Sequence, residues 1–352
     1  MDRREFLKST AAAAAGVTAA TAGAETALAA PALSQGRQQL RLAMPWADAV
    51  AGPADQAQRL GLRIAQATGG RLSFVPSFEV TDGLAAVRAG EADLYFASAH
   101  DHVEAHRGFA CFAGLPGDRG LSPQHLQTWI SLGGGQALWD ELAGDLGIKP
   151  LLVAHTGSRS YLVANERIDS MAALAGRKAC VGGLARDVAR GLGFEPVDIA
   201  PAQLAGALQR GEILAAECGG AIINYALGLH ATAPYWSGTS IQRNGTALSL
   251  AVRRDLWDRL TDSDQTALTA AAAAEYQLSL AEEEAHRHML FPGPTAEYTW
   301  PLAAELSHAI RRVADAVVAH AAGADAQTRR INDSYAAFRQ SVPGLSKGVP
   351  VA

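Results

Sequence analysis

The sequence predicts an α/β protein of two lobes, with a ligand cleft between them and long helices at its C-terminal end. Three observations support this fold class. From residue 40 onward, strand-like segments alternate with amphipathic helices, the order that builds a parallel sheet covered by helices. A similar helix–strand unit occurs once in each half of the chain. In the final third, apolar residues recur every three or four positions, as they do in packed helices.

The elements of the first half follow one another in simple alternation. The helix that begins at Pro53 ends at two glycines, and the next helix ends at Gly90. We expect strands over 40–46, 71–77 and 91–98, and helices over 53–70 and 82–90.

The second half repeats this alternation. Strand-like residues lie within 150–165 and 178–183, helices are predicted over 186–193 and from 204, and a strand follows near 217. The stretches "GLAAVRAGEADLYFAS" and "QLAGALQRGEILAAEC" share one helix–strand pattern, and each strand ends in small or polar residues. Because ligands of open α/β sheets sit beyond the carboxyl ends of strands, we expect both strand ends at one cleft.

The C-terminal third is predicted to be helical over 254–291, 300–323 and 326–342. Its large aromatic residues fit a packed core better than a ligand site. These residues are Trp257, Trp300, Tyr335 and Phe338. The expected organisation is an export signal over 1–30, a first lobe over 38–155, a second lobe over 156–250, and a helical region over 251–342 that packs across both lobes.

Composition narrows the class of function. The chain has 352 residues, 49% of them hydrophobic and 18% charged, and a net charge of -5. It has no basic stripe, so a nucleic-acid partner is not expected. No apolar run of transmembrane length occurs after residue 35.

The N-terminus predicts export. "DRREFLKS" places Arg3 and Arg4 before a weakly hydrophobic, alanine-rich stretch that ends in "ALAA". A charged start, an apolar middle and small residues at the end are typical of an export signal cleaved near Ala29 or Ala30. The twin arginine is similar to that of the twin-arginine (Tat) signal. We therefore expect the mature protein in the periplasm.

Metal and catalytic motifs are weak. Cys111, Cys180 and Cys218 are an odd number, so at least one is unpaired, and Cys111 fits the core beside Phe109 and Phe112. The stretch "HDHVEAH" has metal-type histidine spacing but is more typical of a loop or pocket wall. No hydrolase elbow, phosphate loop or kinase motif is present, so we predict a binding protein and no enzyme.

Several segments together resemble a known family. They are "DRREFLK", "MPW", "GLRIAQATGGRLSF", "GGGQALWDEL" and "AHTGSRSYLVANERIDSMAALAGRKACVGGLARDV". They are similar to the solute receptors of tripartite ATP-independent periplasmic (TRAP) transporters, of the DctP type, and closest to the branch that binds 2-oxoacids. The resemblance runs from about residue 40 to 340. It implies a receptor that closes around a small organic acid or related polar anion and delivers it to TRAP membrane permease subunits.

The residues that hold the ligand in that family are altered here. The resemblance places Cys180 where an arginine usually clamps the ligand carboxylate. It matches Glu217 to a glutamate that holds a metal ion, Cys218 to a tryptophan, and Arg159 to a glutamine that binds the same metal. A guanidinium beside Glu217 would replace the metal and the lost arginine together. A cation next to it would meet a repulsion of about 4 kcal/mol per charge pair at 4 Å.

We therefore expect a site without a metal cofactor, in which Arg159 binds the ligand beside Glu217. Glu217 is the candidate metal ligand if a metal is retained. An alternative is that Arg159 only neutralises a buried Glu217, leaving a weak site. Cys180 and Cys218 are expected as apolar wall residues, with a disulfide between them as the alternative.

Four further residues complete the expected site. The resemblance puts Trp46, from "MPW", at the cleft, and His100 and Asp101 where the branch has aromatic residues, which suggests a more polar ligand than pyruvate. Arg243 lies in a loop that lines the cleft in related proteins. Arg186 is expected to be solvated.

Two other functions remain open at this stage. The first is a receptor-derived sensor or orphan binding protein without transport coupling. The second is an exported enzyme that uses Cys180 or Cys218, for which the sequence nominates no paired base. The long C-terminal helices also leave a homodimer open.

Overall fold

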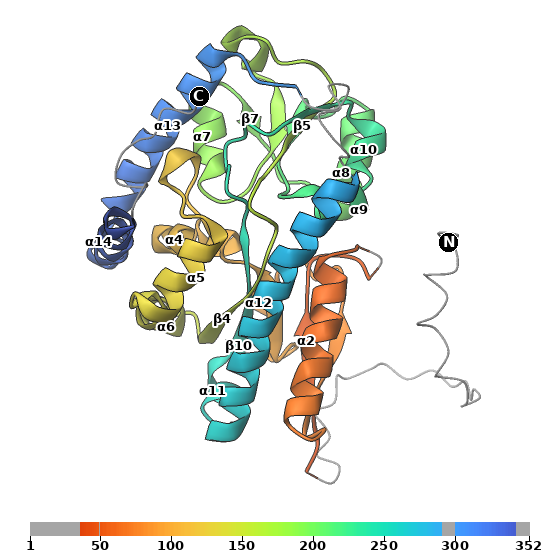
Figure 1. The fold of residues 1–352 in the computed structure, drawn as a ribbon, viewed down its shortest axis with the longest axis vertical. Helices are drawn as coiled ribbons and strands as arrows, with labels where there is room; N and C mark the ends of the chain where they lie inside the picture. The colour runs from red at the N-terminus through yellow and green to blue at the C-terminus, as the bar shows by residue number, and fades with distance from the viewer. Residues whose placement is uncertain (1–35, 49, 291–299, 343–352) are drawn as a thin grey trace, which may run out of the picture. The chain divides into compact units, whose positions relative to one another are not determined.

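The computed structural model describes residues 36–48, 50–290 and 300–342, which lie in the unit Leu33–Ala352 (Figure 1). The expected export signal lies outside the described residues. Strands and helices alternate over the first half as the sequence predicts, and the C-terminal third is helical.

The first sheet has the strand order β2-β1-β3-β10-β4. β1 is parallel to β2 and β3, whereas β10 is antiparallel to both β3 and β4. β10 begins at residue 247, so the chain rejoins the first sheet shortly before the boundary expected at 250. The strands are β1 Gln38–Ala43, β2 Leu72–Ser77, β3 Leu94–Ser98, β4 Ile148–His155 and β10 Ala247–Arg253.

The second sheet has the order β7-β6-β8-β5-β9. β6 is parallel to β7 and β8, and β5 is antiparallel to β8 and β9. Its strands are short: β5 Leu162–Ala164, β6 Lys178–Cys180, β7 Glu195–Pro196, β8 Ala215–Ala216 and β9 Tyr235–Ser237.

The repeated helix–strand unit is confirmed. α3 (Gly83–Arg88) leads into β3 of the first sheet, and α8 (Pro201–Gln209) leads into β8 of the second. The Asp82 side chain accepts the Ala85 N–H at 2.9 Å and so caps α3, while α8 begins with a proline at its first position. In each unit, polar residues therefore follow closely after the end of the strand.

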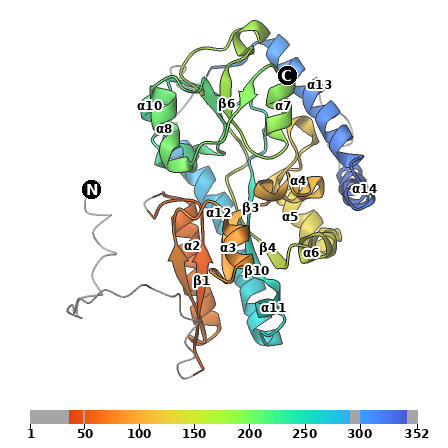
Figure 2. The same cartoon turned by 180° about the vertical axis from the view of Figure 1, so that it is seen from behind.

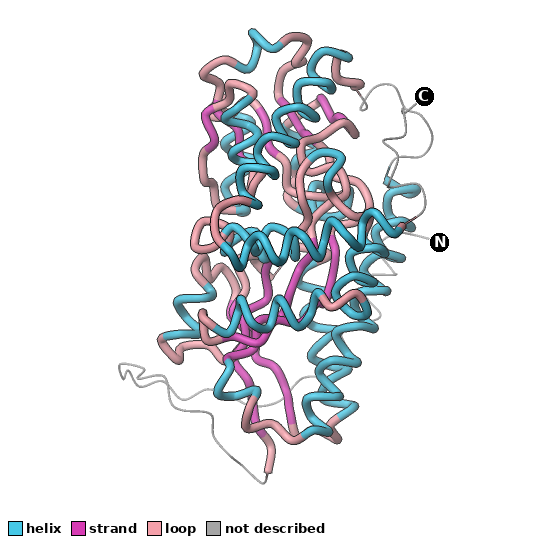
Figure 3. Tube along the Cα trace, turned by 90° about the vertical axis from the view of Figure 1, so that its left-hand side faces the viewer, coloured by secondary structure: helices cyan, strands magenta, loops and turns pink. Residues whose placement is uncertain are grey.

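Helices surround both sheets (Figures 2 and 3). The long α12 (Asp262–Leu290) packs against α2 and β4 and reaches α9 (Figure 1), and α13 lies against α7. The other α-helices are α2 Pro53–Ala67, α4 Ala110–Ala113, α5 Pro123–Leu132, α6 Gly135–Gly144, α7 Ala185–Gly191, α9 Ala221–Ala226, α10 Leu229–Thr232, α11 Arg254–Trp257, α13 Ala304–Ala322 and α14 Ala326–Ser341.

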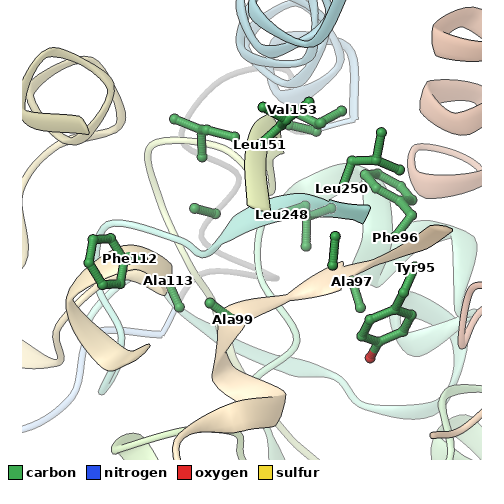
Figure 4. Packing of buried hydrophobic residues seen from close by; sticks show 14 of the residues in the cluster. Tyr95, Phe96, Ala97, Ala99, Phe112, Ala113, Leu151, Val153, Leu248 and Leu250 are labelled. Atoms are coloured by element: carbon green, nitrogen blue, oxygen red, sulfur yellow. The ribbon is translucent and has the colours of Figure 1, made fainter. Parts of the chain in front are cut away.

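The core confirms the expected packing of aromatic residues. Phe112 stacks on Trp129 and Trp139 with ring centroids 5.2 and 4.9 Å apart. Figure 4 shows Phe112 in the same buried cluster as residues of β3, β4 and β10. Trp300 and Tyr335 are buried, and Trp257 and Phe338 pack partly buried against the first core. Cys111 is 1% exposed, as expected for a core residue. Burial raises the pKa of its thiol.

Two connections link the sheets, and they position the site. Residues 156–161 run from β4 to β5, and residues 238–246 run from β9 to β10. Thr246 N donates to Thr156 Oγ1 at 2.8 Å, and Ser160 N donates to the Arg243 carbonyl at 2.8 Å. The two connections therefore lie side by side, and Thr156, Ser160, Gln242 and Thr246 from them line a common cavity.

Candidate ligand-binding cleft

A cavity of about 510 Å³ is lined by residues from the ends of strands in both sheets. Ser98 ends β3, Cys180 ends β6, and Glu217 follows β8 directly. Both connections contribute as well. Among the residues expected at the site, Trp46, His100, Asp101, Cys180, Glu217 and Cys218 line this cavity.

Glu217 forms the floor of the cleft. Its carboxylate accepts the backbone N–H of Ile241 at 2.9 Å and of Gln242 at 2.8 Å. Burial raises the pKa of the Glu217 carboxyl, and hydrogen bonds from those two backbone groups and from the Ser160 and Ser240 hydroxyls oppose the rise. Four neutral donors thus hold this carboxylate without help from a cation.

Gln242 and His100 share one anchor, the Gly114 carbonyl. Gln242 Nε2 donates to it at 2.7 Å, and His100 Nε2 lies 3.3 Å from it. Because a carbonyl only accepts, the His100 tautomer carries its proton on Nε2 and leaves Nδ1 as an acceptor. Burial lowers the pKa of His100 to about 4, so the ring is neutral at neutral pH.

Asp101 is bound by an aromatic hydroxyl. Tyr95 Oη donates to Asp101 Oδ2 at 2.7 Å. The Asp101 side chain keeps contact with solvent, yet enclosure within the cleft raises its pKa, and the Tyr95 hydrogen bond opposes that rise. Trp46 packs on Phe96 with ring centroids 5.7 Å apart and closes one wall.

Cys180 and Cys218 are free thiols and form no disulfide with each other. Both line the cavity, as expected of wall residues. Burial raises the pKa of Cys180, and raises that of Cys218 well above its ordinary value. Both thiols are therefore protonated and weakly nucleophilic at neutral pH.

Arg159 does not form the expected pair with Glu217. Its side chain is exposed and lines a second pocket, beside Ser158 and Glu283. Ser160 lines the cleft, whereas Arg159 and the preceding Ser158 line the second pocket.

Arg243 is displaced from the cleft in the same manner. Its guanidinium pairs with Asp118, and its backbone has a φ of 43°. The preceding residue, Gln242, lines the cleft instead. The residues that the sequence analysis missed, Ser160 and Gln242, are thus immediate neighbours of the two arginines it selected.

No lysine or arginine lines this cavity among the residues that the structure describes. The acidic lining residues are Asp101, Asp198 and Glu217. Asp198 is exposed at the rim, where Arg186 pairs with it. The predicted solvated role of Arg186 is replaced by this ion pair, since its side chain is only 19% exposed.

The second pocket is lined by Ser158 and Arg159 of the connection 156–161 and measures about 240 Å³. Glu283 of α12 lines it, and its carboxylate accepts the Ala221 N–H and, at 3.2 Å, the Ile222 N–H. Burial raises the pKa of Glu283 to about 7, against those hydrogen bonds.

The donor set of the cleft does not resemble a metal site. Within residues 36–48, 50–290 and 300–342, no group of three or more His, Cys, Asp or Glu side chains is arranged to hold a metal ion. The "HDHVEAH" stretch is divided between roles: His100 contacts Gly114, and the buried His102 packs on Phe109 with ring centroids 5.3 Å apart. Both oxygens of Glu217 are already occupied by backbone donors.

Comparison with known proteins identifies relatives of this fold. Residues 122–289 match the family model described as bacterial extracellular solute-binding protein, family 7. A monocarboxylate 2-oxoacid-binding periplasmic protein of Nostoc sp. is 25% identical over 97% of this chain and 95% of its own length.

Solved structures share the fold at low sequence identity. A TRAP transporter solute-binding protein from Bordetella bronchiseptica, with calcium and picolinate, has a TM-score of 0.80 and 21% identity, covering 86% of this chain and 92% of that one. A TRAP receptor from Pseudoalteromonas atlantica, with sodium and pyruvate, has a TM-score of 0.77 and 23% identity over 86% and 94%. The ectoine-binding protein of Halomonas elongata has a TM-score of 0.74 and 16% identity over 87% and 100%.

Proposed function

Because the chain is a receptor of the DctP type, the solute-binding proteins of TRAP transporters, we propose that it captures a small organic acid in the cleft between its two sheets. The observation that carries the proposal is the cavity of about 510 Å³, whose walls come from the strand ends of both sheets. That volume fits a small solute. The name of the Nostoc relative and the picolinate and pyruvate of the solved structures support an organic acid.

We assign the binding role to Glu217, Gln242, His100, Asp101 and Trp46, with Cys180 and Cys218 as apolar wall. This set replaces the Arg159 clamp by residues that line the cavity. The raised pKa values of both thiols support a binding function over a thiol enzyme.

We propose that binding needs no metal ion. Two solved structures contain calcium or sodium with their ligand, so a metal is the alternative to test. The carboxylate that would hold it here accepts two backbone N–H groups and two hydroxyls, which supports a carboxylate held in place without a bound metal ion.

We place the receptor in the periplasm, exported by the twin-arginine signal predicted over 1–30, and assign TRAP permease subunits as its partner. Within the residues that the structure describes, no helix is long and apolar enough to span a membrane.

The test is a thermal-shift screen of the protein from Ala30, purified without ligand, with and without EDTA. The panel contains 2-oxoacids, hydroxy acids, amino acids, aromatic acids and sulfonates. A ligand at a hundredfold its Kd adds about 2.7 kcal/mol of stability. A stabilising solute that is indifferent to EDTA supports the proposal. A requirement for added calcium contradicts the metal-free site, and the absence of any stabilising solute contradicts the receptor function.

A further inference from the structure

We propose that the ligand carries a protonated amine that meets the cleft floor, so that this receptor prefers an amino acid to the 2-oxoacid of the same carbon skeleton. The inference rests on the proposed receptor function and names the substrate class of that same site. It follows from two side chains that the Gly114 carbonyl orients, and from the signs of the charges in the cleft.

Gln242 offers an acceptor that has no donor. Its Nε2 lies 2.7 Å from the Gly114 carbonyl and 3.5 Å from the Gly245 carbonyl. Both partners are carbonyls, so the amide cannot be turned over without losing these bonds. This orientation leaves the buried Oε1 without a hydrogen-bond partner in a residue that is 4% exposed. A buried acceptor in that state favours a donor beside it, and other atoms of the same residue line the cavity.

His100 adds a second acceptor to the same cavity. The Gly114 carbonyl fixes the proton on Nε2, which leaves Nδ1 with a lone pair. The Gly114 carbonyl therefore orients two side chains so that each keeps an acceptor. An ammonium group has three donors and no acceptor, so it complements such a pair, whereas a keto oxygen adds another acceptor.

The charges favour the same ligand end. Both Glu217 oxygens accept backbone N–H groups, the pattern of an ionised carboxylate. Among the described lining residues no lysine or arginine offsets it, and the nearby Arg186 is paired with Asp198 at the rim. A ligand whose only charge is a carboxylate meets like charge at this floor, whereas an ammonium brings the opposite charge.

The experiment measures dissociation constants by calorimetry for matched pairs: alanine and pyruvate, 2-aminobutyrate and 2-oxobutyrate, pipecolate and picolinate. The first two pairs compare an amino acid with the 2-oxoacid of the same skeleton, and the third compares a saturated cyclic amine with an aromatic ring nitrogen beside the same carboxylate. We expect the amine member of at least one pair to bind tenfold or more tightly than its partner. Glu217→Gln is expected to weaken binding of the amine ligand at least tenfold. It is also expected to reduce the difference in affinity between the amine ligand and the oxoacid.

Two further variants separate binding from folding. Asp101→Asn removes an acceptor charge from a residue that keeps contact with solvent and is not needed to hold a backbone turn. Arg159→Ala, outside the cavity, is the matched control and is expected to leave both constants unchanged. Thermal melts of each variant check that it is folded.

The outcomes distinguish this inference from the receptor function. Tighter binding of the oxoacids overturns the inference and leaves the receptor function standing. If neither series binds, the solute released from freshly purified, denatured protein is identified by mass spectrometry. A released amine supports the inference, and a released solute without an amine overturns it. Release of no solute at all overturns both.

Discussion

Two glutamates close to the connection 156–161 both accept hydrogen bonds from consecutive backbone N–H groups, but in different surroundings. Glu217 accepts two consecutive backbone N–H groups, those of Ile241 and Gln242. Glu283 accepts those of Ala221 and Ile222. The first faces a cavity of about 510 Å³ and the second a pocket of about 240 Å³.

The difference lies in what surrounds each carboxylate. Around Glu283, Gly157 and Gly220 approach so closely that a Cβ on either would overlap its side chain, and Gly157 has a φ of 104°. At the cleft, a Cβ on Gly182 would lie 3.9 Å from His100 Nδ1, an ordinary contact, although one on Gly219 would overlap Thr156. Glu283, which accepts backbone N–H groups in a tightly packed region, thus has a structural role. Glu217 accepts backbone N–H groups in the same way but faces an open cavity.

The largest expected effect is a loss of stability when the close packing around Glu283 is disturbed. In Gly220→Ala the new methyl overlaps the Thr156 carbonyl oxygen and Glu283 Oε1. We expect a loss of at least about 3 kcal/mol in the free energy of unfolding, as for strongly overpacked sites. Gly182→Ala is the matched change at the cleft and is expected to cost less than about 1 kcal/mol. Urea denaturation measures both. Equal losses would show that the two sides are packed alike.

The second prediction concerns pH. The pKa of Glu283 is raised to about 7 in the folded protein from an ordinary value of 4.5. Between these values the folded state binds more protons than the unfolded state, so stability is greatest below pH 4.5 and falls as the pH rises to 7. The fall is at most about 3 kcal/mol, at 1.36 kcal/mol per pKa unit. Glu283→Gln removes the charge and is expected to remove this fall.

Denaturation of both proteins at pH 5, 6, 7 and 8 checks this second prediction. The difference in stability between variant and parent is expected to move in favour of the variant as pH rises. A constant difference over this range would contradict a titrating Glu283. The parent curve alone is insufficient, because the buried His155, whose pKa is lowered to about 3, gives a slope of opposite sign between pH 3 and 6.5.

The third prediction contrasts side chains on the two faces. Asp101→Asn is expected to weaken ligand binding about tenfold, the scale of one hydrogen bond to a charged group. Arg159→Ala is expected to change the dissociation constant by no more than about twofold, because the guanidinium lines the other pocket. Calorimetry with the ligand found in the screen measures both. A strong loss in Arg159→Ala would mean that this arginine reaches the cleft when the receptor closes.

The smallest expected effect is on thiol reactivity. Iodoacetamide is expected to label Cys180 and Cys218 at pH 8 more slowly than a thiol introduced at the exposed Ser158, because burial raises both pKa values. Bound ligand is expected to slow the two cleft thiols further and to leave Ser158→Cys unchanged. Peptide mass spectrometry gives the three rates. Equal protection of all three thiols would indicate a general rigidification of the protein.

The order of strands and helices could be predicted because hydrophobic periodicity and glycine stops are local signals. The helix predicted over 82–90 is α3, and the repeated unit ends in β3 and β8 as expected. Glu217, His100 and Asp101 are placed at the cleft by the family resemblance, and all three line the cavity. Each also follows the end of a strand, where ligands of α/β sheets are expected. Such positions are fixed by topology, which the sequence pattern carries.

The arginines could not be placed in this way. Arg159 and Arg243 lie in connections without regular periodicity, where a shift of one residue exchanges the cleft for the opposite face. The expected pair between Arg159 and Glu217 is based on the assumption that a cation must neutralise the Glu217 carboxylate. The backbone amides that meet part of this need carry no signal in residue type, since every residue except proline has an amide.

Helix α12 gives the cleft its frame of reference although none of its described residues lines the cavity. Arg59 of α2 grips Glu275 of α12 at 2.7 Å, and Glu283 stands eight residues further along, about 12 Å by the helical rise. There it fixes the amides that begin α9, three residues after Cys218. The position of the cleft floor therefore depends on contacts that α12 makes with the first lobe. Variation that tunes the receptor need not touch its ligand at all.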